Sequence, residues 1–109
     1  MTPIKSVHLL NPSTVAETGA AYSGPWSAAR KGLVQATIDG TGAVTATVVV
    51  QGSNDGAHWT DIGTLSLNGA GGTDTKTQAV DYPWAQLRAV SSALVGVGAT
   101  VQASLSLSN

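Results

Sequence analysis

Short runs in which apolar and polar residues alternate constrain the fold of this chain more than any other feature. The run 43–51 places four apolar residues on one face, at Val44, Ala46, Val48 and Val50. The last run does the same with Val101, Ala103, Leu105 and Leu107. Successive side chains of a strand point to opposite faces, so a period of two predicts strands with one buried face. Helical periodicity is nearly missing from the sequence.

Turn residues between the runs predict how the strands connect. The run 34–39 leads into Asp39-Gly-Thr-Gly42, which predicts a hairpin turn into the run 43–51. In the strand predicted over 59–67, the apolar phase shifts at Gly63, which indicates a bulge. Further strands are predicted over 4–10, 20–23, 73–80 and 84–91, with a last turn over 94–98. The total is about seven or eight short strands, which predicts an all-β, antiparallel β-sandwich of jelly-roll-like form.

One segment, residues 11–32, breaks the pattern. It contains Pro12, Gly19, Gly24 and Pro25 and has no sustained period. Loops of this length are uncommon in compact domains and tend to be functional. We therefore expect a single domain over residues 1–109, with 11–32 as an extended arm or long loop.

The composition restricts both the core and the partners. The chain has no Phe, so its core must consist mostly of Val, Leu, Ile and Ala, and burial against partner subunits would add to its stability. Five Lys and Arg against six Asp and Glu leave no basic patch for a phosphate backbone, so nucleic acid is not an expected partner. No stretch approaches the roughly 20 apolar residues of a membrane span, and no signal peptide is evident. We expect synthesis in the cytoplasm and no membrane partner.

Residues that carry catalysis or bind metals are few. His8 and His58 are interpreted as edge or surface histidines, and most acidic residues lie in or beside turns, where Asp caps its own backbone. Asn54-Asp55-Gly56 lacks the series of oxygen ligands that a calcium loop needs. Cysteine is absent, which excludes disulfides and thiolate sites. We expect no enzymatic activity, no catalytic residue, no cofactor and no metal.

The tryptophans are the candidate binding residues. Trp59 is either a core anchor or a platform for a sugar, and we prefer the core because an indole is the largest apolar group in this Phe-free chain. Trp26 and Trp84 adjoin prolines, where they either close the ends of the sandwich or anchor an interface. The predicted interface residues are Tyr22, Trp26, Arg30, Tyr82 and Trp84.

A longer motif surrounds Trp59. Gln51-Gly-Ser-Asn-Asp-Gly56, followed by Trp59 and Ile62-Gly-Thr64, resembles a strand, turn and strand signature of small β-sandwich structural proteins of tailed bacteriophages. The run Tyr82-Pro-Trp-Ala-Gln-Leu-Arg-Ala89 is similar to the second half of that pattern, and the resemblance lies within residues 43–107. The signature is also found in discoidin-like and other carbohydrate-facing sandwiches. Physically it specifies a hairpin, with side-chain caps and a glycine for positive φ.

The resemblance implies a virion structural protein on the capsid surface. Such decoration or cement proteins bind the shell as homo-oligomers, so the major capsid protein or another virion subunit is the expected partner. Two alternatives remain open, a tail or fibre module that binds host carbohydrate and a free-standing small β domain. Exposed aromatics on a concave face would favour carbohydrate, whereas a flat surface of about 800 Å² per partner would favour a subunit contact.

Overall fold

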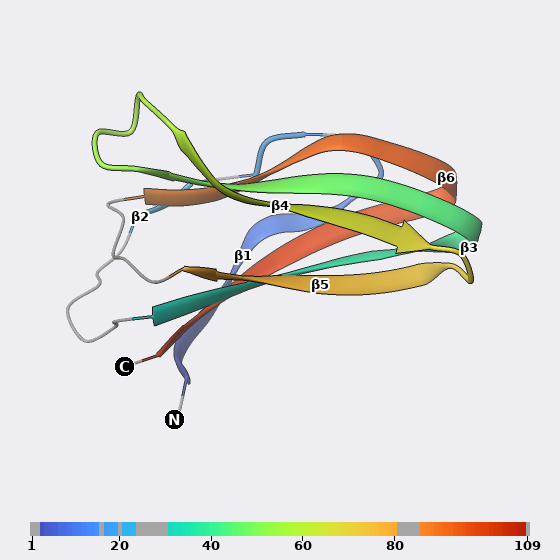
Figure 1. Cartoon of the computed structure of the whole chain (residues 1–109), viewed down its shortest axis with the longest axis horizontal. Helices are drawn as coiled ribbons and strands as arrows, with labels where there is room; N and C mark the ends of the chain where they lie inside the picture. Colours follow the sequence, from blue (N-terminus) through green and yellow to red (C-terminus); the bar gives the residue numbers. More distant parts are fainter. Residues whose placement is uncertain (1–2, 16, 20, 24–30, 81–85, 109) are drawn as a thin grey trace.

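The computed structural model describes residues 3–15, 17–19, 21–23, 31–80 and 86–108. They form one antiparallel sheet, and no helix occurs among them, so the all-β prediction is confirmed. Six strands make up this sheet: β1 (Pro3–Ser13), β2 (Tyr22–Ser23), β3 (Lys31–Ser53), β4 (Thr60–Gly69), β5 (Thr73–Val80) and β6 (Gln86–Ser108) (Figure 1).

The two longest strands, β3 and β6, organise the sheet. The first part of β3 pairs with β5 on one side and with the last part of β6 on the other. Its last part pairs with β4 and with the first part of β6. Strand β1 adjoins the last part of β6, and β2 adjoins its first part. The bends of β3 and β6 divide the sheet into two parts, which we name the β1/β5 half and the β2/β4 half (Figure 1).

The predicted hairpin at Asp39-Gly-Thr-Gly42 is wrong. Segments 34–39 and 43–51 do not pair with each other, because both belong to the single strand β3, which bends where its register with β6 shifts. The predicted turn at 94–98 is likewise a bend within β6. Glycines make both bends possible, since Gly42, Gly96 and Gly98 have φ of 74°, 131° and 62°. Joining these segments into long strands reduces the expected seven or eight strands to six in the part of the chain that the structure describes.

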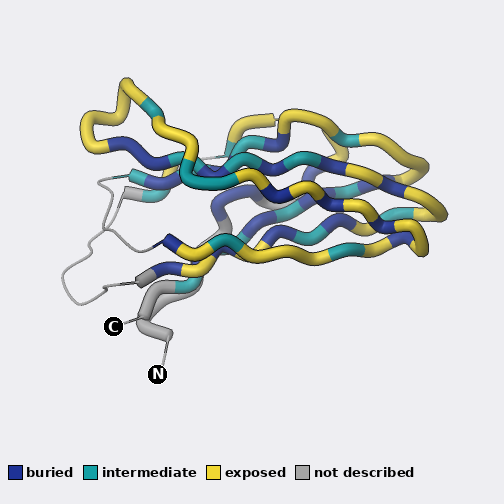
Figure 2. Tube along the Cα trace, viewed as in Figure 1, coloured by how far each residue is buried: buried dark blue, intermediate teal, exposed yellow. Residues whose placement is uncertain are grey.

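The core is built from residues of both halves and follows the sequence pattern. Buried residues alternate with exposed ones along the strands (Figure 2). The predicted inward residues are confirmed at Val44, Ala46, Val48, Val50, Val101, Ala103 and Leu105. Leu107 lies outside the side chains whose burial is described. Both halves contribute to one cluster, which also contains Val34, Ile38 and Leu65. Trp59 does not belong to that cluster and is only half-buried, so its predicted place in the core is wrong.

Several local predictions are confirmed. Strands β3 and β4 form the hairpin predicted around Ser53–Gly56. The predicted bulge is present, since Val50 pairs with Gly63 and Gln51 with Asp61, which leaves Ile62 as the extra residue of β4.

The segment 11–32 is less independent than expected. Strand β1 continues to Ser13, and residues 17–19 run along β6, where the Ser91 amide donates to Glu17 O and the Gly19 amide to Ala89 O, both at 2.8 Å. Gly19 is required there because a Cβ would lie 1.8 Å from the carbonyl oxygen of Leu9. The described part of this segment is therefore held against the sheet, and residues 24–30 lie outside the description.

Candidate functional site

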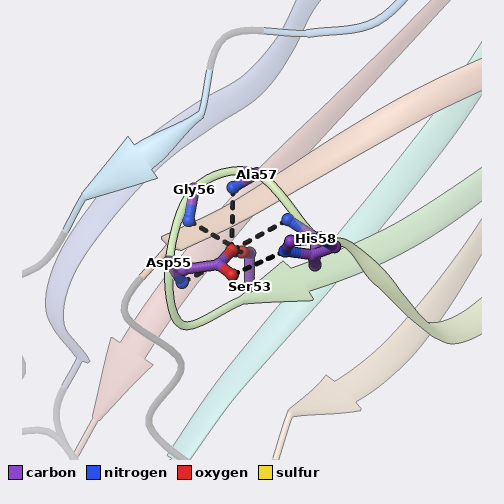
Figure 3. Close-up of polar contacts among 5 residues, drawn as sticks. All are labelled: Ser53, Asp55, Gly56, Ala57 and His58. Carbon is purple, nitrogen blue, oxygen red and sulfur yellow. Dashed lines mark hydrogen bonds and ion pairs between the residues drawn. The ribbon is translucent and has the colours of Figure 1, made fainter.

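The turn between β3 and β4 is held by its own side chains (Figure 3). The Oγ of buried Ser53 accepts the backbone N–H groups of Asp55 at 3.3 Å and Gly56 at 2.9 Å. Asp55 Oδ1 accepts the N–H groups of Ala57 and His58, each at 2.8 Å. Gly56 has a φ of 76°, which explains why glycine follows Asp55. The loop is exposed from residue 54 to residue 58, yet its backbone is fixed by these hydrogen bonds.

Asp55 is the electrostatic centre of this turn. Its pKa lies well below the usual range, first because it accepts the backbone N–H of His58, then because the His58 side chain and the Ala57 N–H also bond to it. The His58 Nδ1 lies 2.7 Å from Asp55 Oδ2. Both side chains are largely exposed, so solvent screens this pair. The carboxylate oxygens therefore serve backbone and imidazole donors, which supports a turn in place of a calcium loop.

A polar row crosses the outer face of the β2/β4 half next to this turn. Gln51 of β3 pairs in register with Asp61 of β4 and with Arg88 of β6. Its Nε2 donates to Asp61 Oδ1 at 2.8 Å, and its Oε1 accepts from Arg88 Nε at 2.7 Å. One amide side chain thus connects an acid and a base on three adjacent strands.

Trp59 completes this arrangement. The guanidinium carbon of Arg88 lies 4.0 Å from the centroid of a Trp59 ring, within the range of a cation–π contact. Trp59 is half-buried, as are Arg88 and Gln51, whereas Asp61 is exposed. We refer to Gln51, Trp59, Asp61 and Arg88 as the Trp59 cluster. It places a partly exposed tryptophan next to fixed donors and acceptors.

Sequence reasoning missed most of this cluster. The Gln51–Asp61 contact follows from the hairpin register once the bulge at Ile62 is counted, so the sequence contained a signal for it. Arg88 is 37 positions from Gln51, and only the pairing of β3 with β6 brings it to Trp59.

The predicted interface residues fall mostly outside the description. Tyr22 lies on β2, pairs in register with Leu87 and packs half-buried against the core. Trp26, Arg30, Tyr82 and Trp84 lie outside the described residues. The structure therefore gives Tyr22 a packing role, and the predicted interface as a set stays a prediction.

The outer face of the β1/β5 half is covered by hydroxyl and amide side chains. Thr37 and Thr75 are hydrogen-bonded through their hydroxyls at 3.0 Å, and Thr73 Oγ1 donates to Asp39 Oδ1 at 2.9 Å. Gln35 and Thr77 continue the same face. Among the described side chains of this face, Leu33 is the large apolar residue that is exposed, at the end opposite the bends. At the bend of β6, Val95 and Val97 are 64% and 74% exposed.

In the described part of the chain, no group of three or more His, Cys, Asp or Glu side chains could hold a metal ion. Among the same residues, no helix is long and apolar enough to cross a membrane.

The whole fold has a counterpart among solved structures. It is similar to the crystal structure of the SPBc2 prophage-derived protein YomS, with a TM-score of 0.60 over 95% of this chain and 92% of that chain. The two sequences are 10% identical, so the likeness concerns the fold. No model of a known protein family matches the chain, and no curated protein sequence does.

Proposed function

We propose that this protein is a structural component of a bacteriophage virion, a homo-oligomeric decoration or cement subunit that binds the outer capsid shell. The observation that carries the proposal is the likeness of fold to a prophage-derived protein over 95% of this chain and 92% of that one. We interpret the folded sheet as the jelly-roll-like β-sandwich expected from the sequence. Its place would be the capsid surface, with the major capsid protein or another virion subunit as partner.

The surface chemistry supports attachment through protein–protein contacts. The outer face of the β1/β5 half consists largely of hydroxyl and amide groups, which are cheaper to remove from water than ions. Exposed Val95 and Val97 add apolar surface at the bend. A subunit with such surfaces needs little charge pairing with its neighbours. Trp26 and Trp84, with Arg30 and Tyr82, are the residues we propose as anchors of the contact.

The test uses purified protein and heads that lack it. The mixture is sedimented at low and at high salt, and bound copies are counted. We expect saturable binding that changes by less than about twofold between the two salts, because binding through phosphate-like or ion-pair contacts falls steeply with ionic strength. Trp26→Ala should reduce binding more than it reduces stability, and His58→Ala, on the exposed turn, is the matched control. Absence of binding at both salts refutes the decoration role.

The alternative is a tail or fibre module that binds host carbohydrate, and one observation favours it. Trp59 lies outside the core with part of its surface exposed, as a sugar platform requires. Retention on a glycan array together with absence of shell binding would select this alternative.

A further inference from the structure

We infer that the Trp59 cluster is a binding site for a neutral saccharide. The inference does not rest on the decoration role, since it concerns the outer face of the β2/β4 half whichever part of the virion carries the subunit. It starts from Trp59 itself. This chain has no Phe and three Trp, yet it keeps this indole out of its core and beside exposed polar groups. Arg88 covers one face of this ring, and the opposite face is the one that we assign to the C–H groups of a pyranose.

The polar groups around the ring keep hydrogen-bonding capacity for a ligand. Arg88 uses Nε for Gln51, and within the described chain its two terminal nitrogens have no hydrogen-bond partner. Asp61 uses Oδ1 for Gln51, and its Oδ2 likewise has no partner among the described residues. A guanidinium donates and a carboxylate accepts, and a sugar hydroxyl does both. The cluster therefore presents the complementary pair that adjacent hydroxyl groups can satisfy.

The charges of the cluster point to a neutral ligand. Arg88 and Asp61 are its two charged side chains, and they are opposite in sign, so they sum to zero. Gln51, between them, is neutral and bonds to both. An acidic sugar would gain from Arg88 but would meet the Asp61 carboxylate on the same row. A neutral polyhydroxyl ligand meets no such repulsion.

The dimensions suit a short oligosaccharide. Asp61, Gln51 and Arg88 stand in register on three neighbouring strands. Their outer members are therefore about 10 Å apart at the backbone, which is about the length of two sugar rings. The row is held in place before any ligand arrives, because the self-capped turn 53–58 fixes the approach to Trp59 and Gln51 fixes both partners. Such preorganisation lowers the entropy cost of binding.

The experiment is a titration followed by ¹H–¹⁵N NMR on the full chain. The probes are cellotetraose, maltotetraose and chitotetraose as neutral ligands, and tetragalacturonate as the acidic comparison. The signals of the Trp59 indole Nε1–H and the Arg88 Nε–H, assigned with Trp59→Phe and Arg88→Lys, report on the site. We expect one of the neutral ligands to shift both signals with a dissociation constant of about 0.1 to 1 mM.

Variants separate binding from a purely structural stack. Trp59→Ala and Asp61→Asn should each weaken binding about tenfold, whereas Trp59→Phe keeps a ring and should lose less. Thr77→Ala, on the outer face of the β1/β5 half, is the matched control and should bind as the unchanged protein does. Thermal melting shows which variants are folded. If Trp59→Ala is unfolded, the binding measurements on Trp59→Phe and Asp61→Asn test the inference. The inference is overturned if no neutral ligand shifts these signals at about 10 mM, if only tetragalacturonate does, or if folded Asp61→Asn binds undiminished.

Discussion

Leu105 gives the sharpest test of how the core is built. It is 0% exposed, lies on β6, and pairs in register with Val34 of β3 and Val7 of β1. Neighbouring strands hold its backbone on both sides, so the site cannot collapse easily around a smaller side chain. We expect Leu105→Ala to cost about 3 kcal/mol, within the range of about 2–5 kcal/mol for buried leucines. A domain of this size has only about 5–15 kcal/mol of total stability.

Leu33 supplies the control with the same chemistry. It is 44% exposed and pairs with Ser106, one position from the Val34–Leu105 pair, but on the opposite face of β3. Leu33→Ala should cost less than about 1 kcal/mol. Urea melts followed by circular dichroism measure both losses of stability, and in thermal melts the Leu105 variant should unfold about 10–20 °C below the unchanged protein. The assignment of inward and outward faces would be refuted if the two variants lost equal free energy of unfolding, or if Leu105→Ala lost less than about 1 kcal/mol.

Three further predictions follow from local geometry. Trp59→Ala should cost about 1–2 kcal/mol in urea melts, below the cost for a fully buried indole, and a double-mutant cycle with Arg88→Ala should give a coupling of about 0.5–1 kcal/mol. A coupling of zero would contradict the stack. Gly69→Ala should destabilise by more than about 1 kcal/mol because its Cβ would meet Thr73 backbone atoms at 2.8 to 3.0 Å, whereas Gly71→Ala, with nothing within 4 Å, should be neutral or slightly stabilising. Since the folded-state pKa of Asp55 is lowered, its contribution is complete above the ordinary value of about 3.9 and is lost as the pH falls below it. Asp55→Asn should therefore flatten the acid side of the profile of melting temperature against pH, and an unchanged profile would contradict this.

Local patterns determined much of this fold. Alternation specified which residues of 43–51 and 101–105 face inward, because successive side chains of a strand point to opposite faces of the sheet. The Ser53–Gly56 turn was also predictable, because its hydrogen bonds run between residues two or three positions apart. From that turn and the bulge at Ile62, the Gln51–Asp61 contact follows by counting.

The sequence could not show whether its glycines mark a hairpin turn between two strands or a bend within one strand. The glycines after Asp39 permit positive φ, and both a hairpin and a bend use that freedom. The sequence therefore predicted a reversal where the chain continues. The pairing of β3 with its neighbours explains why the chain bends here and does not reverse. Strands β5 and β6 occupy both edges of 32–39, and β4 and β6 occupy both edges of 44–53. The two parts of β3 had no free edge left with which to pair with each other.

The sequence by itself thus determined the extended segments, their inward faces and the turn that precedes Trp59, because these depend on residues close together along the chain. The tertiary structure alone decided that Arg88 stacks on Trp59, and that the indole stands outside the core. The physical reason is register: Arg88 reaches Gln51, 37 positions away, and the neighbouring Trp59 only when β3 and β6 pair in this alignment, which is set by the packing of the whole sheet.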